Sequence, residues 1–327
     1  MKKNIFIYAL LALLTIGCTS KKQPAGAPTN EASNSEGTAT QTATLEGTEV
    51  PPVLAVSVNG LPLFAPFNEG DLMGSGQALR ETPEKYTLFL LDESSFEVNY
   101  KEEKNKQLAN DESYLNQYIY QSQDKMKGQV YAYADAKAVE KYLSTHGDMT
   151  AEGEVIPRTY AEGILVSADY MEGRSLLNFY PTTTEDPDGP QFSPDIIAQV
   201  EKQLGAKVEK NRIVNVIGDE EYYFGIMTTQ PNDKYGIAVW VLAKGNDLCL
   251  KTDTCEVDKE EGRVYWSSFD PDEYMEPVVI AVVKGADGLD IYCMHATTDE
   301  TMNYMLMRQK GNKMQKYDMG GFYQQYE

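Results

Sequence analysis

The 327-residue chain carries 50 acidic and 29 basic residues, so its formal net charge at pH 7 is −21. An acidic surface of this size repels nucleic acid and anionic lipid headgroups, which argues against either as a partner. The chain has only two histidines, His146 and His295, which excludes a histidine-rich zinc or iron site. It also lacks a P-loop, a GxGxxG fingerprint, a GxSxG elbow and an HExxH motif, so we expect no cofactor and no metal.

The N-terminus has the layout of a secretory signal peptide. Lys2 and Lys3 precede an apolar run over residues 5–14, and small or polar residues follow it. The run is too short to cross a bilayer, because a spanning helix needs about 20 apolar residues. No other stretch of the chain is long and apolar enough to span. We therefore predict a cleaved signal peptide over residues 1–17.

The segment Thr15-Ile16-Gly17-Cys18 resembles the lipobox of bacterial lipoproteins, in the relaxed form found in Bacteroidetes. The resemblance covers only these first residues, and Thr15 stands where leucine is usual. It implies cleavage between Gly17 and Cys18, followed by attachment of fatty acyl chains such as palmitate to Cys18. Because each buried CH₂ contributes about 0.8 kcal/mol, two or three chains would anchor the protein in a membrane. The alternative is an ordinary secreted protein that is cleaved nearby.

The residues after Cys18 predict a tether and favour one side of the membrane. Residues 18–50 are rich in Thr, Ser, Ala, Gly and Pro, so they cannot bury enough apolar surface to become ordered. Thirty such residues reach roughly 30 Å. Residues 19–23 contain no acidic side chain, whereas surface-exported Bacteroidetes lipoproteins carry acids there. This resemblance implies the periplasmic face of the outer membrane, with the cell surface as the alternative.

Residues 51–190 predict a mixed α/β N-terminal lobe. Asn59-Gly60 separates two apolar strands and is typical of a hairpin turn. Asp135 precedes an amphipathic segment and can cap a helix there. Turn formers and charges gather in residues 182–190, which we take as the boundary of the lobe. The predicted strands cover 53–58, 61–67, 86–91, 95–100, 129–134, 161–170 and 174–181, and the predicted helices 111–126 and 136–147.

Residues 191–327 predict a helix followed by an antiparallel β lobe. Ser193 and Pro194 begin the helix and Gly205 ends it. Two segments, 237–254 and 278–298, resemble each other as strand, Lys-Gly turn and strand. This spacing of about 40 residues leaves a β-propeller as an alternative, but two hairpins of one sheet explain it better. Nine strands are predicted, over 212–218, 221–229, 236–245, 248–253, 263–268, 277–285, 289–296, 303–309 and 313–319. The fold class is thus a β-rich α+β protein with antiparallel sheets and about three helices.

Cysteine and histidine offer few sites. An oxidising compartment permits a disulfide, either Cys249–Cys255 or Cys249–Cys293, but three buried free thiols suit the odd number better. Cys293 and His295 share one face of a predicted strand, although catalytic Cys-His pairs usually lie far apart in sequence. His146 lies at the end of the predicted helix 136–147, where its charge would suit the helix C-terminus.

Acidic clusters and aromatic residues are the remaining candidates. The clusters at 185–189, 258–262 and 269–277 offer oxygen ligands for calcium, but none has the spacing of an EF-hand loop. Several aromatic residues would suit either a sugar- or peptide-binding surface or, more simply, the packing of strands. These aromatic residues are Tyr222, Tyr223, Trp240, Tyr265 and Trp266.

No motif indicates catalysis, so we predict a lipid-anchored envelope protein with a binding or structural role. Its ligand would be a protein or a glycan. One alternative is a hydrolase of envelope or other glycans, which would need two carboxylates in a cleft. Another is an accessory subunit of a secretion or fimbrial assembly, which would need an exposed apolar patch.

Overall fold

The computed structural model describes residues 52–58, 82–101, 131–150, 152–158, 160–182, 189–266, 274–296 and 301–323. The predicted signal peptide, Cys18, the tether, the second strand of the Asn59-Gly60 hairpin and the predicted helix 111–126 lie outside these residues. The described part is a β-rich α+β fold with antiparallel sheets, as the sequence predicts. None of its helices is long and apolar enough to cross a membrane.

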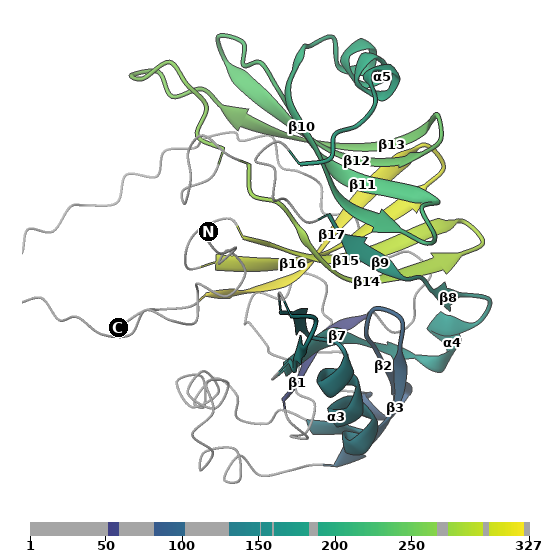
Figure 1. Cartoon of the computed structure of the whole chain (residues 1–327). Helices are drawn as coiled ribbons and strands as arrows, with labels where there is room; N and C mark the ends of the chain where they lie inside the picture. The colour runs from purple at the N-terminus through teal and green to yellow at the C-terminus, as the bar shows by residue number, and fades with distance from the viewer. Residues whose placement is uncertain are drawn as a thin grey trace, which may run out of the picture.

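A small sheet forms the N-terminal part of the fold, at the bottom of Figure 1. Its strand order is β1-β7-β2-β3-β4, and every neighbouring pair is antiparallel. Helix α3 (Ala136–Thr145) packs on one face of this sheet. The strands are β1 (Val53–Val58), β2 (Tyr86–Leu90), β3 (Ser95–Lys101), β4 (Tyr131–Ala134) and β7 (Tyr160–Ser167). Short elements flank them: the 3-10 helix η2 (Pro83–Lys85), the pair β5 (Asp148–Met149) and β6 (Val155–Ile156), and helix α4 (Ala168–Met171).

A ten-stranded sheet forms the rest of the fold and curls into a half-barrel. It contains two antiparallel four-stranded meanders, which meet where β13 and β17 run parallel at Leu250 and Lys313. The first meander is β10 (Val208–Ile217), β11 (Tyr222–Thr229), β12 (Tyr235–Lys244) and β13 (Asp247–Glu256). The second is β14 (Val278–Gly285), β15 (Gly288–Ala296), β16 (Thr301–Lys310) and β17 (Lys313–Tyr323).

The two outer edges of the curled sheet are joined by one short segment. Strand β8 (Ser175–Leu176) pairs with β14, and strand β9 (Phe179–Pro181) pairs with β10. Between them Leu177 donates a hydrogen bond to Val282 (2.9 Å), and Asn178 accepts one from Gly218 (2.8 Å). Residues 175–181 therefore belong to the curled sheet, although they precede the boundary that we predict at 182–190.

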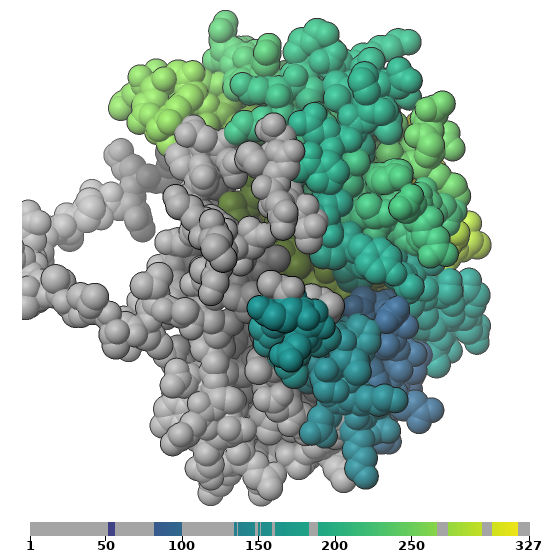
Figure 2. All heavy atoms as spheres, in the orientation of Figure 1, coloured from purple at the N-terminus to yellow at the C-terminus, as the bar shows by residue number. Residues whose placement is uncertain are grey.

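The described elements form five layers, from α3 through the small sheet, β14–β17 and β10–β13 to helix α5 (Pro194–Leu204) (Figure 1). Each interface has its own apolar cluster. The cluster between the small sheet and β14–β17 includes Leu90, Ile164 and Leu306, all nearly inaccessible. In Figure 2 the same order is visible on the surface, with the green atoms of the first meander above the blue and dark teal atoms of the small sheet.

The ends of α3 and α5 form as their sequences predict. The Asp135 side chain accepts hydrogen bonds from the backbone N–H groups of Lys137 (3.1 Å) and Ala138 (3.3 Å). Ser193 caps α5 in the same way, and Gly205 ends it at φ 65°, a left-handed conformation that glycine adopts without steric cost. These caps satisfy N–H groups that a helix cannot satisfy internally.

Three sequence expectations differ from the structure. The β-propeller alternative is wrong, because the two similar segments form the hairpins β12–β13 and β14–β15 of a single sheet. The predicted strand at 263–268 is reduced, within its described part, to one bridge between Val257 and Val264. The strand predicted over 161–170 ends at Ser167, because the Ser167 hydroxyl caps α4 by accepting from the N–H of Tyr170.

Candidate functional site

A cavity of about 1100 Å³ lies where the small sheet meets the hairpin turns of the second meander. Four segments line it, within residues 84–87, 167–174, 285–290 and 308–311. They bring the start of β2 and helix α4 against the β14–β15 and β16–β17 turns. Because residues far apart in the chain converge here, this cavity is a candidate binding site of the described structure.

A buried ion pair borders the cavity. Asp290 and Arg308 lie directly opposite each other on β15 and β16. Arg308 donates through Nε to Asp290 Oδ1 and through Nη2 to Oδ2, both at 2.6 Å. The exposed fractions of the two side chains are 12% for Arg308 and 9% for Asp290. A bidentate pair of this kind fixes both side chains in one geometry.

Two tyrosines extend the ion pair into a network that joins helix α4 to the second meander. The Tyr170 hydroxyl donates to Asp290 Oδ2 (2.7 Å), and the Tyr292 hydroxyl donates to the Tyr170 oxygen (2.5 Å). Burial and the charge of Asp290 raise the pKa of Tyr170, and burial beside Tyr170 raises the pKa of Tyr292. Both tyrosines are therefore hydrogen-bond donors at neutral pH. Burial would lower the pKa of Arg308, but its hydrogen bonds to Asp290 outweigh burial and raise it.

Arg174 faces the cavity in a different setting from Arg308. Its Nη1 donates to the Tyr170 carbonyl oxygen, and its guanidinium carbon lies 4.5 Å from the centroid of the Tyr170 ring. Gly285 lies close to the same side chain, since an added Cβ there would be 3.2 Å from Arg174 Nε. Among the residues that the structure describes, no carboxylate forms an ion pair with Arg174. The guanidinium is thus held in place without being neutralised.

The charges that line the cavity are unevenly distributed. Asp290 and Arg308 neutralise each other, whereas four exposed carboxylates stand around them. Lys310 is exposed, and Lys85 is partly buried. The exposed carboxylates are those of Glu84, Asp169, Glu172 and Asp287. The cavity thus presents the guanidinium of Arg174, which has no carboxylate partner among the described residues, next to the Asp290–Arg308 ion pair. Exposed carboxylates surround both.

A second polar cluster lies on the inner face of the curled sheet, around His295. The His295 ring lies 5.2 Å from Trp240 and 5.1 Å from Tyr274, measured between ring centroids. Its Nε2 contacts the carbonyl oxygen of Met275 at 2.8 Å, and its buried Nδ1 has no hydrogen-bond partner among the described residues. Burial lowers the pKa of His295 to about 4. The imidazole is therefore neutral at pH 7, with Nε2 protonated toward Met275.

Asp253 is the acceptor at the centre of this inner cluster. Its Oδ2 accepts from Trp240 Nε1 and from the Tyr274 hydroxyl, both at 3.1 Å. Burial alone would raise the pKa of Asp253, but Lys316, Lys251 and the hydrogen bonds outweigh burial and lower it. Trp240 is fully buried, so the cluster is part of the core.

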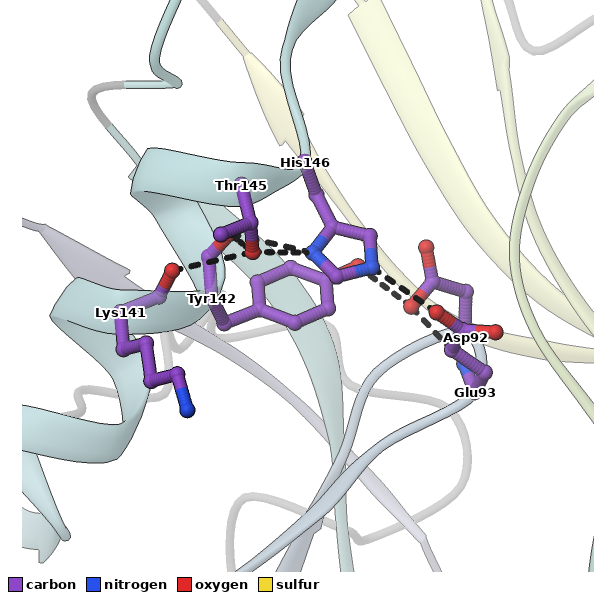
Figure 3. Close-up of polar contacts among 6 residues, drawn as sticks. All are labelled: Asp92, Glu93, Lys141, Tyr142, Thr145 and His146. Carbon is purple, nitrogen blue, oxygen red and sulfur yellow. Dashed lines mark hydrogen bonds and ion pairs between the residues drawn. The ribbon is translucent and has the colours of Figure 1, made fainter.

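A third cluster ties the end of α3 to the β2–β3 turn (Figure 3). His146 stacks on Tyr142 with the ring centroids 4.0 Å apart, and its Nδ1 lies 3.1 Å from the Tyr142 carbonyl oxygen. His146 Nε2 lies 2.8 Å from Glu93 Oε1, and the Tyr142 hydroxyl donates to Asp92. Both ring nitrogens face oxygen acceptors at a helix C-terminus, where a positive charge is favourable. The ion pair is half exposed and serves to anchor the turn.

The three cysteines that the structure describes form no disulfide. Cys249, Cys255 and Cys293 are free thiols. The pairing of Cys249 with Cys255 is wrong, because six residues of one extended strand, β13, separate them by about 20 Å, far beyond disulfide reach. Burial raises the pKa of the Cys293 thiol to about 12, which makes it inert toward His295 chemistry.

The predicted aromatic residues do not form one surface. The rings of Trp240 and Trp266 each lie 6.3 Å from the Tyr274 ring, measured between centroids, next to the cluster around His295. Tyr222 is 7% exposed and lies under Lys244 and Lys284 near the hairpin turns, away from Tyr265. Tyr265 is 38% exposed and stacks on Arg263. Core packing thus accounts for Trp240 and Tyr222.

The predicted calcium clusters are only partly described. Asp258 accepts hydrogen bonds from the N–H groups of Glu260 and Glu261, both at 2.8 Å, so its carboxylate stabilises a turn. Most of the clusters at 185–189 and 269–277 lies outside the described residues. Within the described ranges, no group of three or more His, Cys, Asp or Glu side chains is placed to hold a metal ion.

Sequence reasoning did not identify the residues around the cavity. Asp290 and Arg308 are single charged residues inside otherwise apolar strands, and a buried charge in such a place needs a partner. That signal was present in the sequence.

Comparison of the chain with protein-family models, curated proteins and solved structures gave no match. The site is therefore interpreted from its geometry alone.

Proposed function

We propose that this chain is a lipid-anchored protein of the bacterial cell envelope that acts by binding a ligand rather than by catalysis. The basic N-terminus, the apolar run and the lipobox-like residues before Cys18 support the anchor. Residues 19–23 lack acidic side chains, which supports the periplasmic face of the outer membrane. The tether up to residue 50 would hold the folded body roughly 30 Å from the lipid surface.

The cavity between the two sheets supports a binding role. Its most buried carboxylate, Asp290, is already bound to Arg308 and Tyr170 through both oxygens. The tyrosines of the network are held in the protonated form, so neither can act as a nucleophile or base at neutral pH. What the cavity offers is fixed hydrogen-bonding groups, which suit recognition.

A hydrolase is the alternative that the cavity also supports, because exposed carboxylates surround it. The two functions differ in one measurement. A glycosidase needs a carboxylate pair, so Glu172→Gln and Asp287→Asn would abolish turnover if those residues supplied it. For a binding protein, incubation with envelope glycans or peptides releases no product, and these variants change only affinity.

The anchor is tested by separating membrane and soluble fractions. We expect Cys18→Ala to move the protein from the membrane fraction to the soluble fraction, because no acyl chain can then be attached. Cys255→Ala is the matched control, since Cys255 is a free thiol within the folded body, and it should stay in the membrane fraction. Mass spectrometry should find a diacylglyceryl-modified cysteine at the mature N-terminus. An unmodified N-terminal peptide contradicts the anchor.

A further inference from the structure

We propose that the cavity between the small sheet and the second meander binds a short peptide with free termini, whose terminal carboxylate is bound by Arg174. The proposal rests on the binding role proposed above and names the class of ligand. It is argued from three features of the described residues: an unneutralised arginine, its rigid placement, and the charges around it.

Arg174 is a partly buried arginine that forms no ion pair in the described structure. Arg158 forms none there either, but it is exposed and does not line the cavity. Arg212, Arg263 and Arg308 all form ion pairs with carboxylates. Arg174, in contrast, has only the Tyr170 ring and the Tyr170 carbonyl oxygen as partners in the described structure. A guanidinium whose remaining N–H groups face a cavity is suited to bidentate binding of a carboxylate.

The placement of Arg174 is fixed before any ligand binds. The Tyr170 ring supports the guanidinium, and Gly285 lies so close that an added Cβ would be 3.2 Å from Nε. Tyr170 is itself held by Asp290 and Tyr292 within the buried network. Because the arginine is already ordered, little side-chain entropy is lost when it binds an anion. The buried network therefore acts as a support for the binding group.

The exposed carboxylates around the cavity favour a ligand that carries a positive charge as well as a negative one. The exposed carboxylates of Glu84, Asp169, Glu172 and Asp287 outnumber the two lysines that line the cavity, Lys85 and Lys310, and so disfavour a dianion such as phosphate. A zwitterion instead places its carboxylate on Arg174 and its ammonium group among these carboxylates. The cavity of about 1100 Å³ exceeds the usual range of about 300–1000 Å³ for small-ligand pockets, so it accommodates more than a single amino acid.

Binding of trialanine to the purified full-length chain tests the proposal by isothermal titration calorimetry. We expect trialanine to bind, and both N-acetyl-trialanine and trialanine amide to bind more weakly, because each lacks one charge. Inorganic phosphate is titrated as the competing anion. We expect Arg174→Gln to weaken trialanine binding about 10- to 100-fold, the loss that follows from removing charge-assisted hydrogen bonds.

Two further variants separate the role of Arg174 from a general loss of structure. Gly285→Ala keeps the charge but places a methyl group against Nε, so a smaller loss of affinity is expected. Arg263→Gln is the matched control, because Arg263 also stacks on a tyrosine, at 4.8 Å from Tyr265, but lies outside the cavity. It should bind trialanine like the wild type. Circular dichroism of each variant confirms that the fold is retained.

The outcomes distinguish this inference from the proposed function. Equal trialanine affinity in wild type and a folded Arg174→Gln variant overturns the assignment of Arg174. Absence of heat with all three peptides up to millimolar concentration overturns the peptide ligand, and phosphate binding without peptide binding does the same. Neither result affects the lipid anchor, which is tested by Cys18→Ala. Release of alanine from trialanine would instead contradict the non-catalytic role.

Discussion

The two faces of β14–β17 carry their polar groups in different ways. The outer face packs against the small sheet and holds Asp290, Tyr292 and Arg308, whose side chains form the network around the cavity. The inner face packs against the first meander and is mostly apolar, with His295 near one end, Lys316 near Asp253, and Lys284 at the hairpin end. The outer network binds each carboxylate oxygen of Asp290, whereas the Nδ1 atom of His295 has no partner among the described residues.

The difference shows how a sheet that is buried on both sides accommodates ionisable groups. On the outer face the partner strand and α4 supply the donors that a buried carboxylate needs, so a charge is tolerated. On the inner face the imidazole stays neutral, since burial lowers its pKa to about 4. Asp290 thus keeps its charge by pairing with Arg308, whereas the His295 imidazole stays uncharged.

Removing one partner of the outer network should give the largest effect on stability. Asp290→Ala leaves the Arg308 guanidinium buried without its carboxylate, and breaking such a pair typically costs about 3–5 kcal/mol. The free energy of unfolding, measured by urea denaturation, should fall by that amount. Asp287→Ala is the control, because Asp287 is an exposed carboxylate on the same cavity, and the stability should not change.

A second carboxylate, that of Glu162, lies between the small sheet and β14–β17, and it allows the comparison to be tested through the pH dependence of stability. Burial raises the pKa of Glu162 on β7 to about 7, although a hydrogen bond with Tyr304 lowers it in part. In the unfolded chain glutamate ionises near pH 4.5, so between pH 4.5 and 7 the folded state binds more protons and stability falls as pH rises. The loss is at most about 3 kcal/mol. We expect Glu162→Gln to be more stable than wild type at pH 8 but not at pH 4.

The inner face should show the opposite dependence on pH. His295 is protonated near pH 6.5 in the unfolded chain but only near pH 4 when folded, so its contribution to stability is lost as pH falls from 6.5 to 4. The contributions of His295 and Glu162 therefore oppose each other over nearly the same range. His295→Phe keeps the aromatic stacking and removes the titration, although it costs the hydrogen bond to Met275.

Unfolding midpoints measured from pH 4 to 8 test both substitutions together. Stability of His295→Phe should fall with pH more steeply than that of wild type, because only the Glu162 contribution remains. Stability of Glu162→Gln should rise with pH over the same range. Identical pH profiles in the two variants would contradict the opposed titration of the two faces.

The local elements of the fold were predictable from the sequence, because their signals lie within a few residues. Asp135, Ser193 and Gly205 mark helix ends through short-range hydrogen bonds and backbone conformation, and all three act as predicted. The predicted pair of hairpins within one sheet is likewise confirmed. These features depend on the residues that form them and little on the rest of the fold.

The candidate site was not predictable in the same way. Residues 289–295 alternate between two buried faces, so both sets are largely apolar and the sequence does not indicate which face is which. Tyr170 and Asp290 are 120 residues apart and meet only because α4 packs on the outer face. Asp290 and Arg308 are paired because the register of β15 and β16 places them opposite each other. A charged residue within each of two otherwise apolar strands was a sequence signal for this pairing, but it did not show that the pair borders a cavity.

The smallest effect on stability is expected from breaking ion pairs of the inner face that are exposed to solvent. At the hairpin end of the curled sheet, Glu221 accepts hydrogen bonds from Lys244 and from Lys284, the latter at 3.0 and 3.3 Å. The exposed fractions of these side chains lie between 33% and 48%, so solvent screens the ion pairs. We expect Glu221→Gln to change the urea midpoint far less than Asp290→Ala does, and the small change to vanish at 1 M salt. If Glu221→Gln lowered the free energy of unfolding as much as Asp290→Ala does, the location of an ion pair on the inner face, and not its burial, would determine the cost of breaking it. A small, salt-sensitive change would show that burial determines it.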